Sequence, residues 1–213
     1  MIAAIPMPYR STDKTRQKKD AKRTAMMQAA VRVFAQKGYH AATVRDIVSE
    51  ADVAIGTFYF YFPDKETLFN HLFEETAAFL LQAIDQALIS RSSFPAQLEA
   101  AVQAYVNVAF YEPAVVQLLL VGGMGSAPSL SERRAEYREK LIRAWQRALN
   151  AALERQQIEP QNTRRTAEAL VGALDEIIFH LLSSPQAEQE RTAAVRDMVQ
   201  LGLRAAGYLY APS

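Results

Sequence analysis

Hydrophobic positions between residues 43 and 51 recur at the spacing of one helix face. The apolar side chains lie three or four residues apart, which places them on a single buried stripe. They are Val44, Ile47, Val48 and Ala51. Thr43, with Asp46 three residues later, has the spacing of a capping box and predicts where this short helix begins.

The next apolar run carries more aromatic side chains than a short helix can bury. Its helical repeat predicts that Val53, Phe58 and Phe62 point inward, and Pro63 ends the run because proline cannot continue the helical hydrogen bonds. The side chains left without a place inside are Ile55, Thr57, Tyr59, Phe60 and Tyr61. We therefore expect this helix to present a surface to a partner.

This segment resembles the DNA-binding domain of the TetR family of one-component repressors. The family pattern is a threonine before a short helix, a four-residue turn, Gly-x-x-Tyr-x-x-Phe and a lysine three residues later. The matching residues here are Thr43, Ala51, Asp52, Val53, Ala54, Gly56, Tyr59, Phe62 and Lys65, preceded by Ala29, Ala30, Phe34, Gly38 and Tyr39. The resemblance covers residues 24–72 and implies a helix-turn-helix, with Gly38 as a left-handed cap closing the first helix.

Two residues depart from the family pattern. Asp52 replaces the usual turn glycine, so a left-handed backbone there carries a steric cost that glycine avoids. Ala54 replaces the usual serine and removes a side-chain cap worth roughly 1 kcal/mol. The carboxylate of Asp52 is the alternative cap.

The remaining chain predicts helices and almost no strands. We expect an all-α protein with a three-helix DNA-binding head and a larger C-terminal helical domain for ligand binding and dimerisation. The expected domains are a flexible basic arm at 1–15, the head at 16–64 and the helical domain at 65–213. The expected later helices are 64–90, 95–111, 113–120, 129–157, 163–182 and 187–208, with a loop at 122–128.

Candidate DNA contacts fall into two groups. Hydroxyl, ammonium and helix-start groups suit phosphate oxygens, which predicts that Thr43, Tyr59, Tyr61 and Lys65 position the head. Arginine grips guanine and a methyl or ring packs on the thymine methyl, so base edges are assigned to Arg45, Thr57 and Phe60. Gly56 allows a close backbone approach.

The distribution of charge supports a nucleic-acid partner. Residues 1–42 contain nine basic and two acidic side chains, a local formal charge of +7 within a total of +1. Such an arm before a helix-turn-helix favours contact with phosphate, and a solvated tail is the alternative.

Composition narrows the possible functions. The chain has no cysteine, which excludes disulfides and thiolate chemistry, and no apolar run reaches the length of a membrane span. His40, His71 and His180 do not form a metal-ligand pattern, and we find no phosphate-binding loop or nucleophile motif. We expect a cytoplasmic protein that is not an enzyme and needs no cofactor or metal.

The resemblance further implies a cavity for a small-molecule effector in the helical domain. Large apolar residues that could line it are Phe69, Phe73, Phe79, Tyr105, Phe110, Met124, Trp145 and Phe179. A polar end could meet Asn107, Tyr111, Arg134, Asp175 or His180. Ordinary core packing is the alternative for each of them. The supply of aromatic side chains favours a hydrophobic or amphipathic effector, with acyl-type or aromatic metabolites ranked first.

Small residues in the last two helices indicate close packing of helix backbones. They are Ala169, Gly172 and Ala173 in the first, and Gly202, Ala205 and Ala206 in the second. The resemblance implies that these helices form a homodimer interface, with packing inside one chain as the alternative. The predicted function is a homodimeric repressor released from a palindromic double-stranded operator by its effector. The alternatives are an activator or nucleoid-type protein without an effector, and a helical enzyme or carrier.

Overall fold

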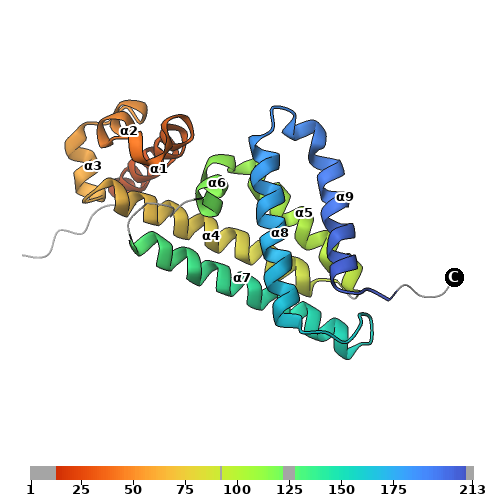
Figure 1. Ribbon diagram of the computed structural model, residues 1–213. Helices are drawn as coiled ribbons and strands as arrows, with labels where there is room; N and C mark the ends of the chain where they lie inside the picture. The colour runs from red at the N-terminus through yellow and green to blue at the C-terminus, as the bar shows by residue number, and fades with distance from the viewer. Residues whose placement is uncertain (1–12, 92, 122–127, 210–213) are drawn as a thin grey trace, which may run out of the picture. The chain divides into compact units, whose positions relative to one another are not determined.

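A computed structural model describes residues 13–91, 93–121 and 128–209, and this part of the chain contains nine helices (Figure 1). The helices are α1 (Asp13–Ala41), α2 (Val44–Glu50), α3 (Ile55–Tyr61), α4 (Lys65–Ile89), α5 (Phe94–Tyr111), α6 (Pro113–Val121), α7 (Pro128–Glu154), α8 (Thr163–Ser183) and α9 (Ala187–Ala205). The all-α prediction is confirmed. The chain divides into two compact units, Met1–Phe69 and Asn70–Ser213, with the boundary after the first turn of α4.

The helices of the first unit begin and end largely for local reasons. Thr43 caps α2, and the predicted capping box with Asp46 is present in both directions. Asp52 has a φ of 51°, the left-handed conformation expected of this turn. Ala54 precedes α3 without a side-chain hydrogen bond from any described residue, so Asp52 does not supply the missing cap.

Gly38 interrupts α1 in a way the sequence predicted only in part. Its φ of 74° is positive, as expected, but its ψ of 161° lies outside the left-handed helical region. The helical conformation is therefore interrupted at Gly38, and a short helical segment follows as far as Ala41. A side chain would be strained at this φ, which explains the glycine.

One apolar core holds the first unit together. α2 packs on α1 and α3 packs on α2. The fully buried side chains that meet there include Met26, Ala30, Ile47, Phe58, Phe62 and Leu68.

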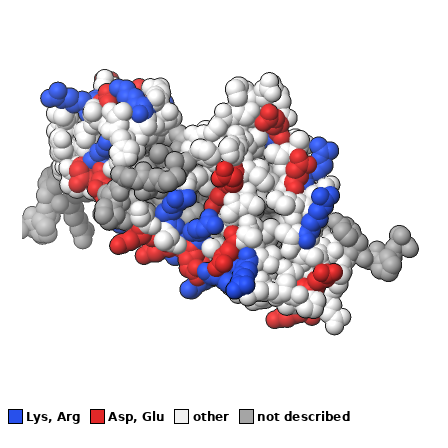
Figure 2. Space-filling model, viewed as in Figure 1, with Lys and Arg blue, Asp and Glu red and all other residues white. Residues whose placement is uncertain are grey.

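The second unit is a helical bundle in which α5 is central. α7 packs on α8, α9 packs on both α5 and α8, and α5 also contacts α6, α7 and α8. Trp145, Leu98 and Leu141 are buried in its core. An isolated antiparallel bridge between Ile158 and Tyr208 joins the segment that follows α7 to the segment that follows α9. Acidic and basic side chains intermix on the face of the molecule shown in Figure 2. On α7, Glu139 pairs with Arg143 of the same helix and with Arg164 of α8.

Most predicted helix ends are within three residues of those observed. α7 begins at Pro128, so Ser129 lies inside the helix, and α9 ends at Ala205 because the chain turns at Gly207, whose φ is 59°. Met124, the 122–127 part of the expected loop and residues 1–12 of the basic arm lie outside the described residues. Among the described helices, none is long and apolar enough to cross a bilayer.

Candidate DNA-binding surface and effector cavity

The helix α3 turns aromatic side chains outward. Tyr59 is 54% exposed and Phe60 is 67% exposed, whereas Phe58 and Phe62 are completely buried. The two buried rings lie 5.7 Å apart, centroid to centroid, and attach α3 to the core. The expected inward position of Phe58 and Phe62 and the expected outward position of Tyr59 and Phe60 are therefore present. Val53, which was expected to be buried, is half-buried.

Gly56 lies on the exposed surface of α3. A Cβ atom built at this position would meet no described atom within 4 Å. Nothing in the described protein therefore requires a glycine at this position. Thr43 and Arg45 are also exposed, and Thr57 and Tyr61 are half-buried.

Asp46 links the start of α2 to the end of α1. Its carboxylate accepts from Lys37 Nζ at 2.7 Å and from the backbone N–H of Thr43 at 2.9 Å. These interactions, with the ammonium of Lys37 first, lower the pKa of Asp46 to about 2. The carboxylate therefore stays ionised over the whole range in which a DNA-binding protein is normally used.

The ammonium group of Lys65 is engaged within the first unit. It donates to the carbonyl oxygens of Tyr39 at 2.6 Å, Ala42 at 2.7 Å and His40 at 3.5 Å. It also lies 4.5 Å from the centroid of the Tyr39 ring, and burial lowers its pKa. The first residue of α4 is thus joined to the end of α1, an arrangement that sequence spacing could not reveal.

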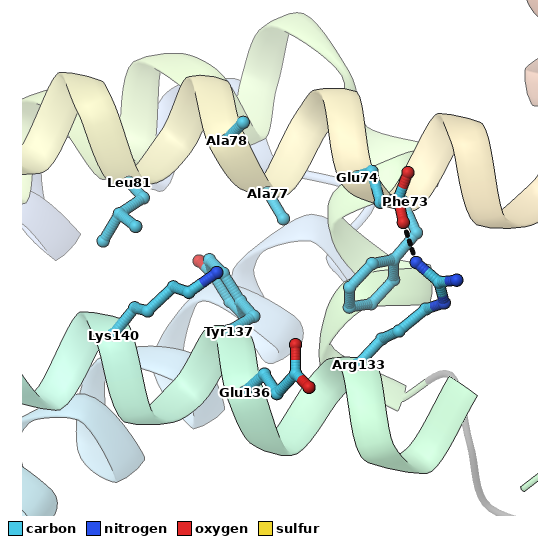
Figure 3. A pocket seen from close by; sticks show the side chains of 9 residues that line it. All are labelled: Phe73, Glu74, Ala77, Ala78, Leu81, Arg133, Glu136, Tyr137 and Lys140. Atoms are coloured by element: carbon cyan, nitrogen blue, oxygen red, sulfur yellow. Dashed lines mark ion pairs between the residues drawn. The ribbon is translucent and has the colours of Figure 1, made fainter. Parts of the chain in front are cut away.

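A cavity of about 340 Å³ lies between α4 and α7 (Figure 3). Its α4 wall is mostly apolar, with Phe73, Ala77, Ala78, Leu81 and the carboxylate of Glu74. The α7 wall carries Arg133, Glu136, Tyr137 and Lys140. An ion pair between Arg133 and Glu74 bridges the two helices at one end.

A part-buried polar cluster connects α5, α7 and α8. Asp175 accepts from the hydroxyl of Tyr105 at 2.6 Å and from Arg138 Nη1 at 2.9 Å. Burial raises the pKa of Asp175, although Tyr105, Arg138 and Arg134 act in the opposite direction. The predicted residues Tyr105, Arg134 and Asp175 therefore belong to one neighbourhood.

Other predicted effector residues are distributed elsewhere. Phe79, Asn107 and Tyr111 line an open groove of about 630 Å³ between α4 and α5, and Tyr111 is 78% exposed. The guanidinium carbon of Arg191 lies over the ring of Phe110, 4.7 Å from the ring centroid. These residues do not join the α4/α7 cavity.

Three further predicted effector residues have structural surroundings of their own. Phe69 packs against the rings of Phe34 and Tyr39 in the first unit, at 5.6 and 4.8 Å. Trp145 is buried in the core, and His180 pairs with Glu176 on the exposed side of α8 beside Phe179. Of the predicted apolar lining, Phe73 is the residue that the α4/α7 cavity contains.

Two parts of the chain match described protein families. Residues 26–72 match the family described as bacterial regulatory proteins, tetR family, and residues 95–203 match the tetracyclin repressor-like C-terminal domain. The second match alone covers more than half of the 213 residues. The chain belongs to the TetR family of DNA-binding transcriptional regulators. This is a family of regulators and not of enzymes.

Among curated relatives, the fatty acid metabolism regulator protein of Bacillus subtilis is 29% identical over 83 residues, covering 39% of this chain and 43% of that protein. The repressor KstR2 of Rhodococcus jostii is 27% identical over 129 residues, covering 57% of this chain and 62% of that protein. The matched part is less than two thirds of either relative's length.

Solved TetR-type structures agree over most of the chain. The fatty acid degradation regulator FadR of Bacillus halodurans is 24% identical with a TM-score of 0.78, covering 88% of this chain and 97% of that one. FadR of Bacillus subtilis in complex with stearoyl-CoA is 19% identical with a TM-score of 0.74, covering 85% and 98%. At these identities the likeness shows the fold alone.

In this TetR-family chain, the α7 wall of the cavity was not predicted from the sequence. Tyr137, Leu141, Trp145 and Leu149 lie four residues apart on the buried stripe of α7. A tyrosine on an otherwise apolar stripe was the available signal, because its hydroxyl needs a partner when buried. Arg138, which bonds Asp175, carried no comparable signal.

The small residues of α8 and α9 have different surroundings. Gly202 faces Leu98 of α5, where a Cβ atom would lie 2.8 Å from Cδ2, and Ala206 is fully buried. Packing inside one chain explains both, and a Cβ atom at Gly172 would lie 3.4 Å from Arg138 Nη2 of α7. Four of the small residues are exposed or half-buried. These are Ala169, Gly172, Ala173 and Ala205.

Proposed function

We propose that this TetR-family regulator is a homodimeric repressor that leaves a palindromic operator when a hydrophobic or amphipathic effector binds the second unit. The observation that carries the DNA-binding half is the orientation of α3. Two buried rings, Phe58 and Phe62, hold the helix, while Tyr59 and Phe60 face outward without a place in the core.

Roles on this surface follow from chemistry and exposure. We assign phosphate contacts to Thr43, Tyr59 and Tyr61, because hydroxyls suit backbone oxygens. Arg45, Thr57 and Phe60 are assigned to base edges, and Gly56 to close approach. Lys65 supports the surface from behind, since its ammonium already has three carbonyl acceptors.

An acyl-type effector is supported by two independent features. The α4/α7 cavity combines an apolar wall on α4 with charged side chains on α7, which suits a ligand with an apolar body and a polar group. Similar proteins include a fatty acid metabolism regulator and a FadR crystallised with stearoyl-CoA.

A palindromic site and a two-fold dimer go together, because each protomer then meets one half-site.

The deciding experiment is fluorescence anisotropy with DNA flanking the protein's own gene, in a salt series with random duplex as competitor. We expect nanomolar binding that survives the competitor and weakens steeply with salt. Addition of octanoyl-CoA should then release the operator. Tyr59→Phe should weaken binding on all sequences alike, whereas Arg45→Ala should change the preferred bases.

Two results would contradict this proposal at different points. Equal, weak binding to operator candidate and random duplex would argue against sequence-specific binding to this DNA. Specific binding that no acyl or aromatic compound alters would instead favour a regulator without an effector.

A further inference from the structure

The open groove of about 630 Å³ between α4 and α5 exposes two aromatic rings. Phe79 of α4 is 56% exposed, and Tyr111 of α5 is 78% exposed. Neither ring contacts another aromatic ring among the described residues, so their faces are available to a ligand. Val108, which also lines the groove, is buried. Exposed aromatic rings gathered in one groove indicate a binding surface, whereas single exposed rings do not.

The groove and the α4/α7 cavity use different faces of α4. Glu75, Thr76 and Phe79 line the groove, whereas Phe73 and Ala77 line the cavity. At 3.6 residues per turn, these two sets point in different directions from the helix axis. The two sites share no lining residue, so the groove is a separate site.

Both charged residues that line the groove are acidic, and they are Glu75 and Glu112. Glu112 is half-buried at the end of α5, and burial raises the pKa of its carboxyl. Its carboxylate has no hydrogen bond or ion pair within the described part of the chain. A partly desolvated carboxylate is stabilised by a positive charge beside it. The charge of the groove therefore favours a cation.

Arg191 of α9 reaches the edge of the groove but makes no contact with Glu112. Its Nη2 donates to Asn107 Oδ1 at 2.7 Å, its Nη1 pairs with Glu188 at 3.3 Å, and its guanidinium lies over the ring of Phe110. The end of α5 and the start of α6 meet at Glu112, so their helix dipoles have opposite signs there and offset one another. The carboxylates therefore determine the sign of the charge in the groove.

The aromatic rings add a second attraction for a cation. The face of an aromatic ring carries partial negative charge, and an organic cation placed over it is stabilised. Phe79 and Tyr111 supply such faces from the two helices that form the groove. At about 30 Å³ for each water-sized group, 630 Å³ holds roughly twenty heavy atoms. This volume suits an organic cation with a large apolar body.

We propose that the α4/α5 groove is a second ligand site, which binds a lipophilic organic cation with its positive charge beside the carboxylate of Glu112. The apolar body of the ligand lies against the rings of Phe79 and Tyr111. This site does not depend on the acyl-type effector, because the α4/α7 cavity has its own lining residues.

The test is isothermal titration calorimetry of the full-length protein with tetraphenylphosphonium and with tetraphenylborate, two apolar ions of the same shape and opposite charge. The titrations are made in sodium buffer, because potassium precipitates tetraphenylborate. The wild type should bind the cation about tenfold more tightly than the anion, because the carboxylates attract one and repel the other.

Three variants assign the binding to the groove. Glu112→Gln removes the charge and keeps the size of the side chain, so it should weaken binding of the cation about threefold, as expected for a partly exposed ion pair, without weakening binding of the anion. Phe79→Leu keeps an apolar side chain without a ring face and should weaken cation binding by about the same factor. Glu99→Gln is the matched control, because it removes an exposed charge of α5 outside this groove, and both affinities should stay unchanged.

Several results would overturn this second site. They include equal binding of the two ions to the wild type, and no binding of the cation. Cation affinity that neither Glu112→Gln nor Phe79→Leu changes would place the bound ion elsewhere. An equal loss in Glu112→Gln and Glu99→Gln would show a general effect of net charge instead of a local one. None of these results bears on release of DNA by octanoyl-CoA, so the proposed function is tested separately.

Discussion

At the scale of single residues, a substitution at Gly56 should change the stability of the protein and its affinity for DNA in opposite directions. Gly56→Ala should stabilise the protein by about 0.5–1 kcal/mol, because alanine favours a helix and a Cβ there meets nothing within 4 Å. The same methyl group should weaken operator binding if the backbone approaches DNA closely. Thermal melting and anisotropy measure the two effects, with Gln82→Ala on α4 as an exposed control. Unchanged operator affinity would refute the close approach.

Lys65 allows a second test at this scale. The sequence pattern assigns it to phosphate, but its three donors are directed at backbone carbonyls. Lys65→Met should therefore lower the stability of the first unit and the overall affinity without changing the salt dependence of DNA binding. Loss of a direct phosphate contact would instead reduce the slope of log K against log salt by about 0.9. A salt series on both proteins distinguishes the two roles.

At the scale of elements, α2 depends on the charge of Asp46. The folded-state pKa of about 2 lies below the ordinary value of 3.8, so the stabilisation is present above roughly pH 4 and is lost as the pH falls through about 2. Asp46→Asn should melt below the wild type at pH 5, and the difference should shrink toward pH 2. Melting curves at both pH values measure it. A difference that does not change with pH would contradict this account of the cap.

At the scale of the whole molecule, release of DNA by an effector requires reciprocal coupling. A 100-fold loss of operator affinity corresponds to about 2.7 kcal/mol between the two binding events. Saturating operator should then weaken octanoyl-CoA binding by the same factor. Calorimetry with and without the duplex tests this, and a random duplex is the control. If the affinity for the effector is the same with and without operator, release of the DNA by a shift between two states is excluded.

Much of the fold and of the DNA-binding surface was predictable because it depends on neighbours in sequence. The capping box of Thr43 and Asp46, the turn at Asp52 and the burial of Phe58 and Phe62 involve residues within one or two helical turns. Periodicity and capping chemistry act over that range, and they determined the helices and the exposed face of α3.

Tertiary structure decided the features in which distant residues meet. Lys65 bonds carbonyls 23 to 26 residues away, and Gly202 owes its small size to Leu98. Asp175 meets Tyr105 across 70 residues, and the cavity joins α4 to a tyrosine of α7. A helical repeat specifies which side chains point inward, but the atom that each one meets depends on how the helices pack against one another.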